Sequence, residues 1–347
     1  MTTIHTAHLT LRPITDADVT DERIIGWHTD PAGYELMSEA PRTRDDAVEA
    51  LQTWREAWDA DGISYWIAEH EGTPVGIGGV RAMNYQSHPH LNLYYRLDPQ
   101  SWRRSFGSEI ACAATAYAQE FYTAGPVVTR IAPANEPSLR IAERAGMEDL
   151  GPFRMPQDPE HLPDNLLFES PTARLGIGEA YDEVLDLWCR VNASGGAVGW
   201  EGDAPRDEVA RVLDGHLAAA GSTLVRLHAP THDTWDDPDA VGDLLGFGFV
   251  QRGTWFSTEH RATLLRVMTD PADRGRNYGR ILMGALHGTA RRDGAEICEI
   301  SYRGGTGLER FYQQFGYVET GRLAGGLRFS WGEEDDVAMA RSLVSTP

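Results

Sequence analysis

The chain has 347 residues, 41% of them hydrophobic, which favours a globular protein with two domains. It has no apolar run of about 18 residues and no signal-peptide pattern at its start, so we expect a cytoplasmic protein without a membrane span. The net charge of −21 and the pI of about 4.9 argue against nucleic acid and anionic membrane as partners.

The basic residues are all arginine, which excludes mechanisms that need lysine, such as a Schiff base. Cys112, Cys189 and Cys298 lie far apart, and we expect them to be buried apolar residues in a reducing compartment. The histidines at 88 and 90 lie in a segment too short and loop-like to predict a metal site.

The first half alternates predicted strands and helices. Strands are predicted at 92–99 (NLYYRLDP) and 126–133 (PVVTRIAP), and helices at 110–122 and 135–147. Five prolines mark residues 151–171 as a domain edge and connector, in which LLFE (166–169) is a candidate last strand. We therefore expect a first domain at 1–152, a connector at 153–172 and a second domain at 173–347.

The second half repeats this order. A strand at 262–271 (ATLLRVMTDP) leads through a turn into a helix that starts near Tyr278, and a strand at 295–303 and a helix at 305–317 follow. The glycines that frame the two units are 39 residues apart in the first half (Gly107 to Gly146) and 37 in the second (Gly279 to Gly316). Each half is predicted to be an α/β layer fold, with a duplication as the origin.

The turn of the second half carries Arg274, Arg276 and Arg280 at the start of a helix, where the macrodipole disfavours cations. A strand, a small-residue turn and a helix N-terminus together form an anion site, and arginine adds bidentate donors for phosphate. Ion pairs with neighbouring aspartates are the alternative. A Walker lysine motif and a GxGxxG fingerprint are both absent from the sequence, so other phosphate ligands have to be considered.

Residues 269–279 resemble the coenzyme A pyrophosphate motif of the GNAT (Gcn5-related N-acetyltransferase) superfamily, [QR]-x-x-G-x-[GA]. Arg274 and Gly279 match it, and Asn277 stands where the family usually has glycine. The segment 308–322 resembles the family's closing motif, with Tyr312, Gly316 and Tyr317 in register, and AMARSL (338–343) resembles its final strand. The implied fold is two tandem GNAT folds, each a mixed, mostly antiparallel sheet flanked by helices.

The resemblance implies acetyl-CoA as the cofactor. The residues expected to bind it are Met268, Thr269, Arg274, Gly275, Arg276, Asn277, Tyr278, Gly279 and Arg280. It also implies that a backbone N–H at Thr269 polarises the thioester carbonyl and that Tyr312 protonates the departing thiolate.

The general base is less clearly indicated. Glu299 lies within an apolar strand and is a candidate, with Glu259, His260 and a water chain as competitors. Trp200 and Glu201 follow a glycine-rich loop at 191–200 and are candidates for contacting the acceptor, although an ordinary surface loop explains them equally well.

The first half resembles the ribosomal-protein-acetylase (RimJ/RimL-like) branch of the same superfamily, through LTLRPITDAD, WRRSFGSE and the N-x-P-S segment at 135–138. Arg103 and Ser105 replace two turn glycines there, and Ala142 takes the place that corresponds to Tyr312. Ser138 is either a thiolate acid or, as we favour, a helix N-cap. A second cofactor site is a candidate at Arg103, Arg104, Ser105, Phe106, Gly107 and Ser108.

We therefore expect the second domain to transfer an acetyl group to a primary amine of a small molecule by direct attack, and the first to be degenerate. Acetylation of peptide or protein N-termini and acyl-CoA sensing without turnover are the alternatives. A homodimer is left open.

Overall fold

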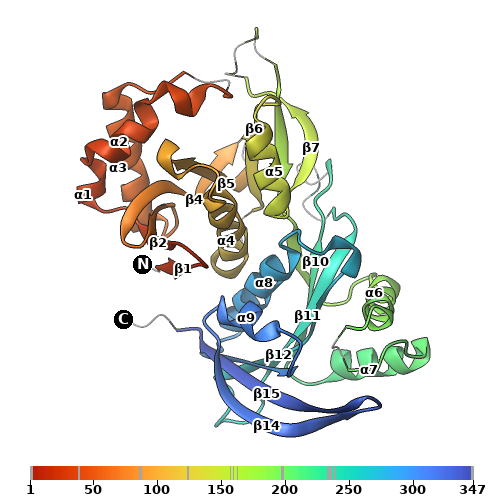
Figure 1. Ribbon diagram of the computed structural model, residues 1–347. Helices are drawn as coiled ribbons and strands as arrows, with labels where there is room; N and C mark the ends of the chain where they lie inside the picture. The colour runs from red at the N-terminus through yellow and green to blue at the C-terminus, as the bar shows by residue number, and fades with distance from the viewer. Residues whose placement is uncertain are drawn as a thin grey trace. The chain divides into compact units, whose positions relative to one another are not determined.

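The computed structural model describes residues 3–37, 40–85, 88–122, 125–156, 158, 160–161, 163–196, 199–232, 237 and 240–344. By its internal contacts the chain divides into two compact units (Figure 1). The first comprises Met1–Ala118, Tyr122–Pro171 and Pro230–Val241, and the second comprises Gln119–Phe121, Thr172–Ala229 and Gly242–Pro347.

The first unit is built on a sheet with the strand order β1-β2-β3-β4-β5-β6-β8-β7. Its strands are β1 Ile4–His5, β2 Thr10–Pro13, β3 Tyr65–His70, β4 Thr73–Tyr85, β5 His88–Leu97, β6 Val127–Ile131, β7 Glu148–Phe153 and β8 Asn165–Glu169. Its helices are α1 Asp16–Val19, α2 Glu22–Thr29, α3 Arg44–Ala60, α4 Phe106–Phe121 and α5 Glu136–Arg144, with short 3₁₀ turns η1 Pro31–Tyr34 and η2 Pro99–Ser101.

The second unit is built on a sheet with the order β14-β15-β13-β12-β11-β10-β9. Its strands are β9 Thr172–Leu175, β10 Ser222–His228, β11 Leu244–Arg252, β12 Arg261–Thr269, β13 Ile297–Arg303, β14 Val318–Phe329 and β15 Gly332–Ser342. Its helices are α6 Tyr181–Ala193, α7 Arg206–Ala218, α8 Tyr278–Arg292 and α9 Leu308–Gln313, with the 3₁₀ turn η4 Pro271–Asp273.

The two sheets share one topology. From β2 onward the first follows the same order as the second from β9 onward, with β5 matching β12 and β6 matching β13. In each sheet these two strands form a parallel pair, whereas the other strand pairs of the described residues are antiparallel. The prediction of two tandem mixed sheets flanked by helices is confirmed.

Strand alternation separates two helical layers in each unit, because successive side chains point to opposite faces of a sheet. In β5, the Tyr94 ring faces His28 of α2, whereas Tyr95, on the other face, lies next to Gly107 of α4. In β11, Phe247 and Phe249 contact residues of α6 and α7, whereas a Cβ on Gly248 would meet Leu286 of α8.

The predicted connector contains a strand. LLFE lies in β8, which pairs with β6 and β7 and so completes the first sheet, as predicted. Residues 197 and 198 of the glycine-rich loop lie outside the described residues. Cys298 is buried as expected, but Cys112 and Cys189 are only partly buried.

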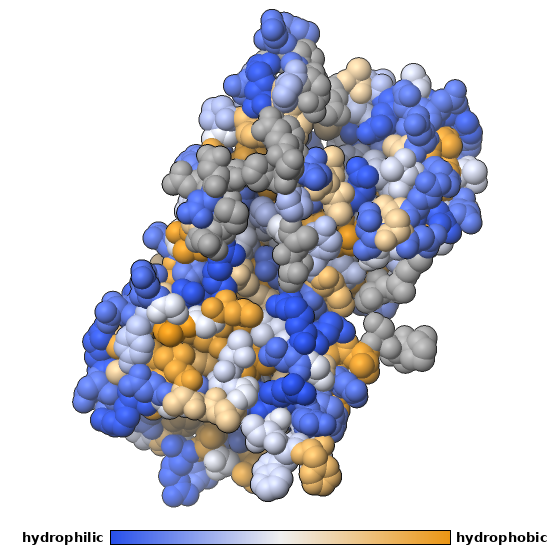
Figure 2. All heavy atoms as spheres, turned by 180° about the vertical axis from the view of Figure 1, so that it is seen from behind, coloured by the Kyte–Doolittle hydropathy of each residue, from blue (hydrophilic) through white to orange (hydrophobic). Residues whose placement is uncertain are grey.

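The surface is mainly polar. Figure 2 shows one face, on which hydrophilic side chains cover most of the area and apolar side chains gather in one part of the second unit. No described helix is long and apolar enough to cross a membrane. Over the same residues, no three His, Cys, Asp or Glu side chains are placed to hold a metal ion.

Candidate active site

The turn between β12 and α8 has the backbone of a tight anion-binding loop. Asp270 accepts a hydrogen bond from the Ala272 N–H at 3.0 Å and so fixes the 3₁₀ turn that follows β12. Gly275 and Asn277 then adopt left-handed conformations with φ of +89° and +65°, and α8 begins directly after Asn277. The first N–H groups of a helix have no partner within the helix, so they converge on the space in front of this turn.

The first unit keeps the same turn with different residues. Asp98 caps η2 in the same way, at 2.9 Å from the Gln100 N–H. Arg103 and Ser105 then occupy the left-handed positions, with φ of +62° and +63°, directly before α4. A side chain in this conformation costs roughly 1–2 kcal/mol, so the turn persists here in spite of its residues.

This strain predicts effects of opposite sign for a substitution that introduces glycine in one turn and a substitution that removes it from the other. Ser105→Gly is expected to raise the free energy of unfolding by about 0.5–1 kcal/mol, since relief of strain exceeds the entropy that glycine adds to the unfolded chain. Gly275→Ala is expected to lower it by a similar amount. Urea unfolding of both variants measures this, and two changes of the same sign would contradict the shared turn geometry.

The arginines of the second turn are not explained by ion pairs with Asp270. That carboxylate pairs with Arg190 of α6 at 2.6 Å. Arg280 hydrogen-bonds to the side chain of Gln314, Arg276 lies over the Tyr278 ring at 5.5 Å, and Arg274 is exposed at the mouth of the turn.

The two parallel strands pair only at the end that lies far from this turn. β12 and β13 pair only from Arg261 to Thr263, and β5 and β6 pair only at Leu91 and Asn92. Beyond these points the facing edges of the two strands are not paired with each other, so backbone groups along the ends of β12 and β5 are available to an extended ligand. The opening leads toward the turn in both units.

A β-bulge distinguishes β12 from β5. The register of β12 against β11 shifts between Phe247 and Phe249, so Arg266 and Val267 stand opposite Gly248 alone. Arg266 has φ of +53°, which is strained for an arginine. β5 pairs with β4 without any shift. A bulge interrupts the ladder and re-aims backbone and side-chain groups, and only the second sheet has one in this strand.

Tyr312 lies at the open end of the separated strands. It sits on α9 with its ring 5.8 Å from that of Tyr302, which is in β13 beyond the paired segment. Its neighbour Phe311 packs against Gly279 of the turn, 3.4 Å from a Cβ built there. Burial raises the pKa of Tyr312 to about 12, with a smaller effect from Tyr302. The hydroxyl is therefore a neutral acid at ordinary pH.

The first unit has no tyrosine at the matching place. A Cβ on Gly107 would lie 3.0 Å from Ile141, just as one on Gly279 would lie 3.4 Å from Phe311, which puts Ala142 where Tyr312 lies. Asn135, and not Ser138, is the N-cap of α5, because its side chain accepts from the Ser138 N–H. The favoured role of Ser138 as a cap is therefore wrong. The Ser138 side chain bonds to Tyr95 instead, and burial raises the pKa of Tyr95 to about 12.

Glu299 lies far from the turn. It forms a two-pronged ion pair with Arg261, with Nε and Oε2 3.1 Å apart, and it stands opposite Thr263 in the parallel pair. Thr263 precedes Thr269 by six residues, a separation of about 20 Å along a strand. This position argues against Glu299 as the general base. The same argument applies to Glu259 and His260, because they lie directly before β12, at the end of the strand far from the turn.

Trp200 and Glu201, the two residues predicted to contact the acceptor, have side chains in different surroundings. Trp200 packs edge-on against Trp188 of α6 at 5.8 Å, whereas the Glu201 carboxylate accepts from the Ser330 N–H at 2.7 Å, in the turn between β14 and β15. The Arg266 guanidinium lies over Trp188, and its Nε donates to His216 Nε2 at 3.3 Å. Our sequence reasoning missed this group, although a cation inside the apolar run LLRVM was a signal for it.

Two family models match the chain, one to each half. The "Acetyltransferase (GNAT) domain" model matches residues 8–148, and the "Acetyltransferase (GNAT) family" model matches residues 205–317. Together they span more than half of the chain. The chain belongs to the GNAT acetyltransferases. The turns of both GNAT domains, at 103–108 and 274–280, lie within the matched segments, and the family uses acetyl-CoA as its acyl donor.

Solved structures that resemble the chain each cover about half of it. A GNAT-family acetyltransferase from Bacillus anthracis is 18% identical, over 48% of this chain and 97% of its own, with a TM-score of 0.40. An acetyltransferase from Agrobacterium tumefaciens str. C58 is 21% identical, over 49% and 94%, with a TM-score of 0.40. YncA, a putative acetyltransferase from Salmonella typhimurium solved with acetyl-CoA, is 14% identical, over 51% and 96%, with a TM-score of 0.41. The family assignment rests on the two models alone. A search of curated proteins gave no match.

Proposed function

We propose that the second GNAT domain transfers an acetyl group from acetyl-CoA to a primary amine of a small molecule. The observation that carries this proposal is the coincidence, in one domain, of the left-handed turn before α8, the bulge in β12 and the buried Tyr312. The first domain has the turn without the other two features.

The residues of the turn suit a diphosphate. The turn leads directly into the N-terminus of α8, and a Cβ on Gly275 would meet nothing within 4 Å, so the turn is open on that side. Arg274 and Arg276 supply charge-assisted donors. The free edge of β12 up to Thr269 is placed for an extended chain that carries amide groups, which is how the pantetheine arm would lie.

Bound acetyl-CoA supplies a thioester that a neutral amine can attack. The backbone N–H of Thr269, at the end of β12, is proposed to hydrogen-bond the thioester oxygen, which takes up negative charge during attack. Tyr312 Oη donates a proton to the departing sulfur, since its raised pKa keeps that proton in place at ordinary pH. The proton of the attacking amine passes to water in this account, and Glu299 has no part in it.

The first domain is proposed to bind rather than to catalyse. Ala142 offers no proton, and β5 has the regular register that lacks a bulge. Its turn at 103–108 keeps the N–H groups of a cofactor site, so acyl-CoA sensing by this domain is the second candidate. The likeness of this half to the ribosomal-protein-acetylase branch stays a prediction.

Incubation of the purified protein with acetyl-CoA and a panel of amines tests the proposed activity. We expect thiol release to rise above acetyl-CoA hydrolysis with at least one small amine, and the N-acetyl product to appear by mass spectrometry. Transfer only to peptide N-termini would favour the peptide alternative. Acetyl-CoA binding without thiol release for any acceptor would favour sensing.

A further inference from the structure

Four rings of the first unit form a cluster between the sheet and helices α2 and α3. Tyr65 and Tyr94 have ring centres 5.2 Å apart, and the Trp54 ring lies 5.0 Å from Tyr65 and 5.4 Å from His28. We call these four residues the ring cluster. Trp54, Tyr65 and His28 are buried, and Tyr94 is half-buried. The ring cluster lies on the face of the sheet opposite α4, away from the turn at 103–108.

Three arginines contact the ring cluster from different elements. Arg96 of β5 donates from Nε to the Tyr94 hydroxyl at 3.0 Å. The guanidinium of Arg81, from β4, is 6.0 Å from the centre of the Tyr65 ring, and that of Arg42, which precedes α3, is 5.9 Å from the Trp54 ring. Burial, together with smaller effects of the Arg96 and Arg42 charges, lowers the pKa of His28 to about 3, so His28 is neutral.

Arg96 is a buried cation. Its side chain reaches the Gly33 carbonyl at 3.0 Å and stacks over Tyr34 at 4.0 Å, and the residue is only 7% exposed. Over the described residues, no carboxylate pairs with Arg96, Arg81 or Arg42. Burial of a charge is costly unless an opposite charge accompanies it. In a chain with a net charge of −21, three guanidinium groups gathered around four rings with no carboxylate paired to them mark a place for an anion.

Two polar atoms at the ring cluster are also without a partner. His28 Nε2 and Arg81 Nε are buried, and neither has a hydrogen-bond partner within the described part of the chain. Buried polar groups of this kind usually have partners in folded proteins. A ligand with hydrogen-bond acceptors would satisfy the Arg81 Nε–H, and also His28 Nε2 in the tautomer that carries its proton there.

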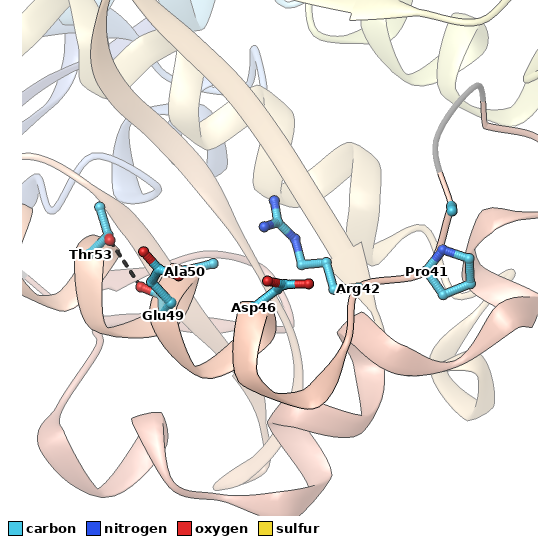
Figure 3. A pocket seen from close by; sticks show the side chains of 7 residues that line it. Pro41, Arg42, Asp46, Glu49, Ala50 and Thr53 are labelled. Atoms are coloured by element: carbon cyan, nitrogen blue, oxygen red, sulfur yellow. Dashed lines mark hydrogen bonds between the residues drawn. The ribbon is translucent and has the colours of Figure 1, made fainter.

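Arg42 links the ring cluster to an open hollow of about 540 Å³. It extends into the hollow from the segment before α3, and Asp46 and Glu49 line the hollow from the helix (Figure 3). The Asp46 carboxylate accepts hydrogen bonds from Thr43 at the start of α3, and these bonds, with a smaller effect of the Arg42 charge, lower its pKa. These two carboxylates would repel a dianion such as phosphate more strongly than a single carboxylate.

We propose that the ring cluster and Arg42, Arg81 and Arg96 bind a small organic carboxylate with an aromatic or apolar body. The carboxylate meets the guanidinium groups, for which arginine geometry is suited, and the body packs on the rings. Bound in this way, the ligand neutralises the buried charge of Arg96. The site gives the first domain a ligand of its own, and it does not depend on acetyl transfer by the second domain.

Titration calorimetry of the full-length protein with phenylacetate, without acetyl-CoA, tests this site. We expect saturable binding, at least tenfold weaker binding of phenylacetamide, which has the same shape without the charge, and at least tenfold weaker binding of inorganic phosphate. Arg81→Leu and Arg96→Met are each expected to weaken phenylacetate binding at least tenfold. Arg23→Ala, which removes an exposed arginine of α2, is the control and should bind as the unaltered protein does.

Absence of saturable heat with phenylacetate would overturn the proposal, as would equal binding of phenylacetamide or unchanged binding by Arg81→Leu. Equal, arginine-dependent binding of phosphate would overturn the role of the rings. If Arg96→Met does not fold, Arg81→Leu decides. Because acetyl-CoA is absent from the experiment, failure here leaves the acetyl-transfer proposal standing, and failure of acetyl transfer leaves this site standing.

Discussion

Replacement of Arg274 and Arg276 together by alanine is expected to weaken acetyl-CoA binding at least about 100-fold. A hydrogen bond to a charged group contributes about 1.5–3 kcal/mol, or about 10- to 100-fold in affinity for each arginine that contacts the diphosphate. The Asp270–Arg190 ion pair that fixes the strand end is untouched, so the turn should keep its shape. Titration calorimetry with acetyl-CoA measures the change.

The matched control is Arg103→Ala with Arg104→Ala, in the equivalent turn of the first domain. We expect the rate of acetyl transfer by this variant to stay within about twofold of the unaltered protein, since these side chains lie outside the proposed catalytic domain. A large loss of turnover here, together with normal turnover by the Arg274 and Arg276 variant, would reverse the roles of the two domains.

Tyr312→Phe is expected to lower kcat by about 10²- to 10⁴-fold, the range for loss of a general acid or base. The KM for acetyl-CoA should change little, because the turn that holds the cofactor is intact. The ring keeps its packing against Tyr302 and Tyr317, so the fold should be retained. Steady-state kinetics from pH 6 to pH 10 measures this, a range over which the hydroxyl stays protonated because its pKa is about 12.

Tyr302→Phe is the control for this variant. Tyr302 is a buried tyrosine whose ring packs against that of Tyr312. We expect its kcat to be close to that of the unaltered protein. Equal losses of kcat in both variants would indicate that the hydroxyls act through packing. An unchanged kcat in Tyr312→Phe would remove Tyr312 from the chemistry.

Local patterns in the sequence were sufficient to predict the fold class and the position of the turn before α8. Apolar spacing placed the start of α8 at Tyr278, and asparagine's tolerance of positive φ accounts for the left-handed conformation of Asn277. These features depend on a few neighbouring residues. The repeat also followed from local order, because both halves place an Asp-Pro pair at the same distance before a helix.

Features that depend on pairing between distant strands were not predicted. The bulge at Arg266 arises from the register of β12 against β11, which no local pattern encodes. The position of Glu299 was not foreseen for a similar reason, since its distance from the turn follows from the parallel register with Thr263. The ring cluster joins residues from four elements, so no local pattern predicts it. The one indication in the sequence was Arg96, a cation within the apolar strand NLYYRLDP.

A crystal structure of the protein with coenzyme A tests the central claim most directly. We predict density for the diphosphate against the backbone of residues 275–280, with the pantetheine arm along the free edge of β12 and the sulfur near Tyr312. Density confined to the turn at 103–108, or a protein that crystallises without coenzyme A at high ligand concentration, would contradict the account.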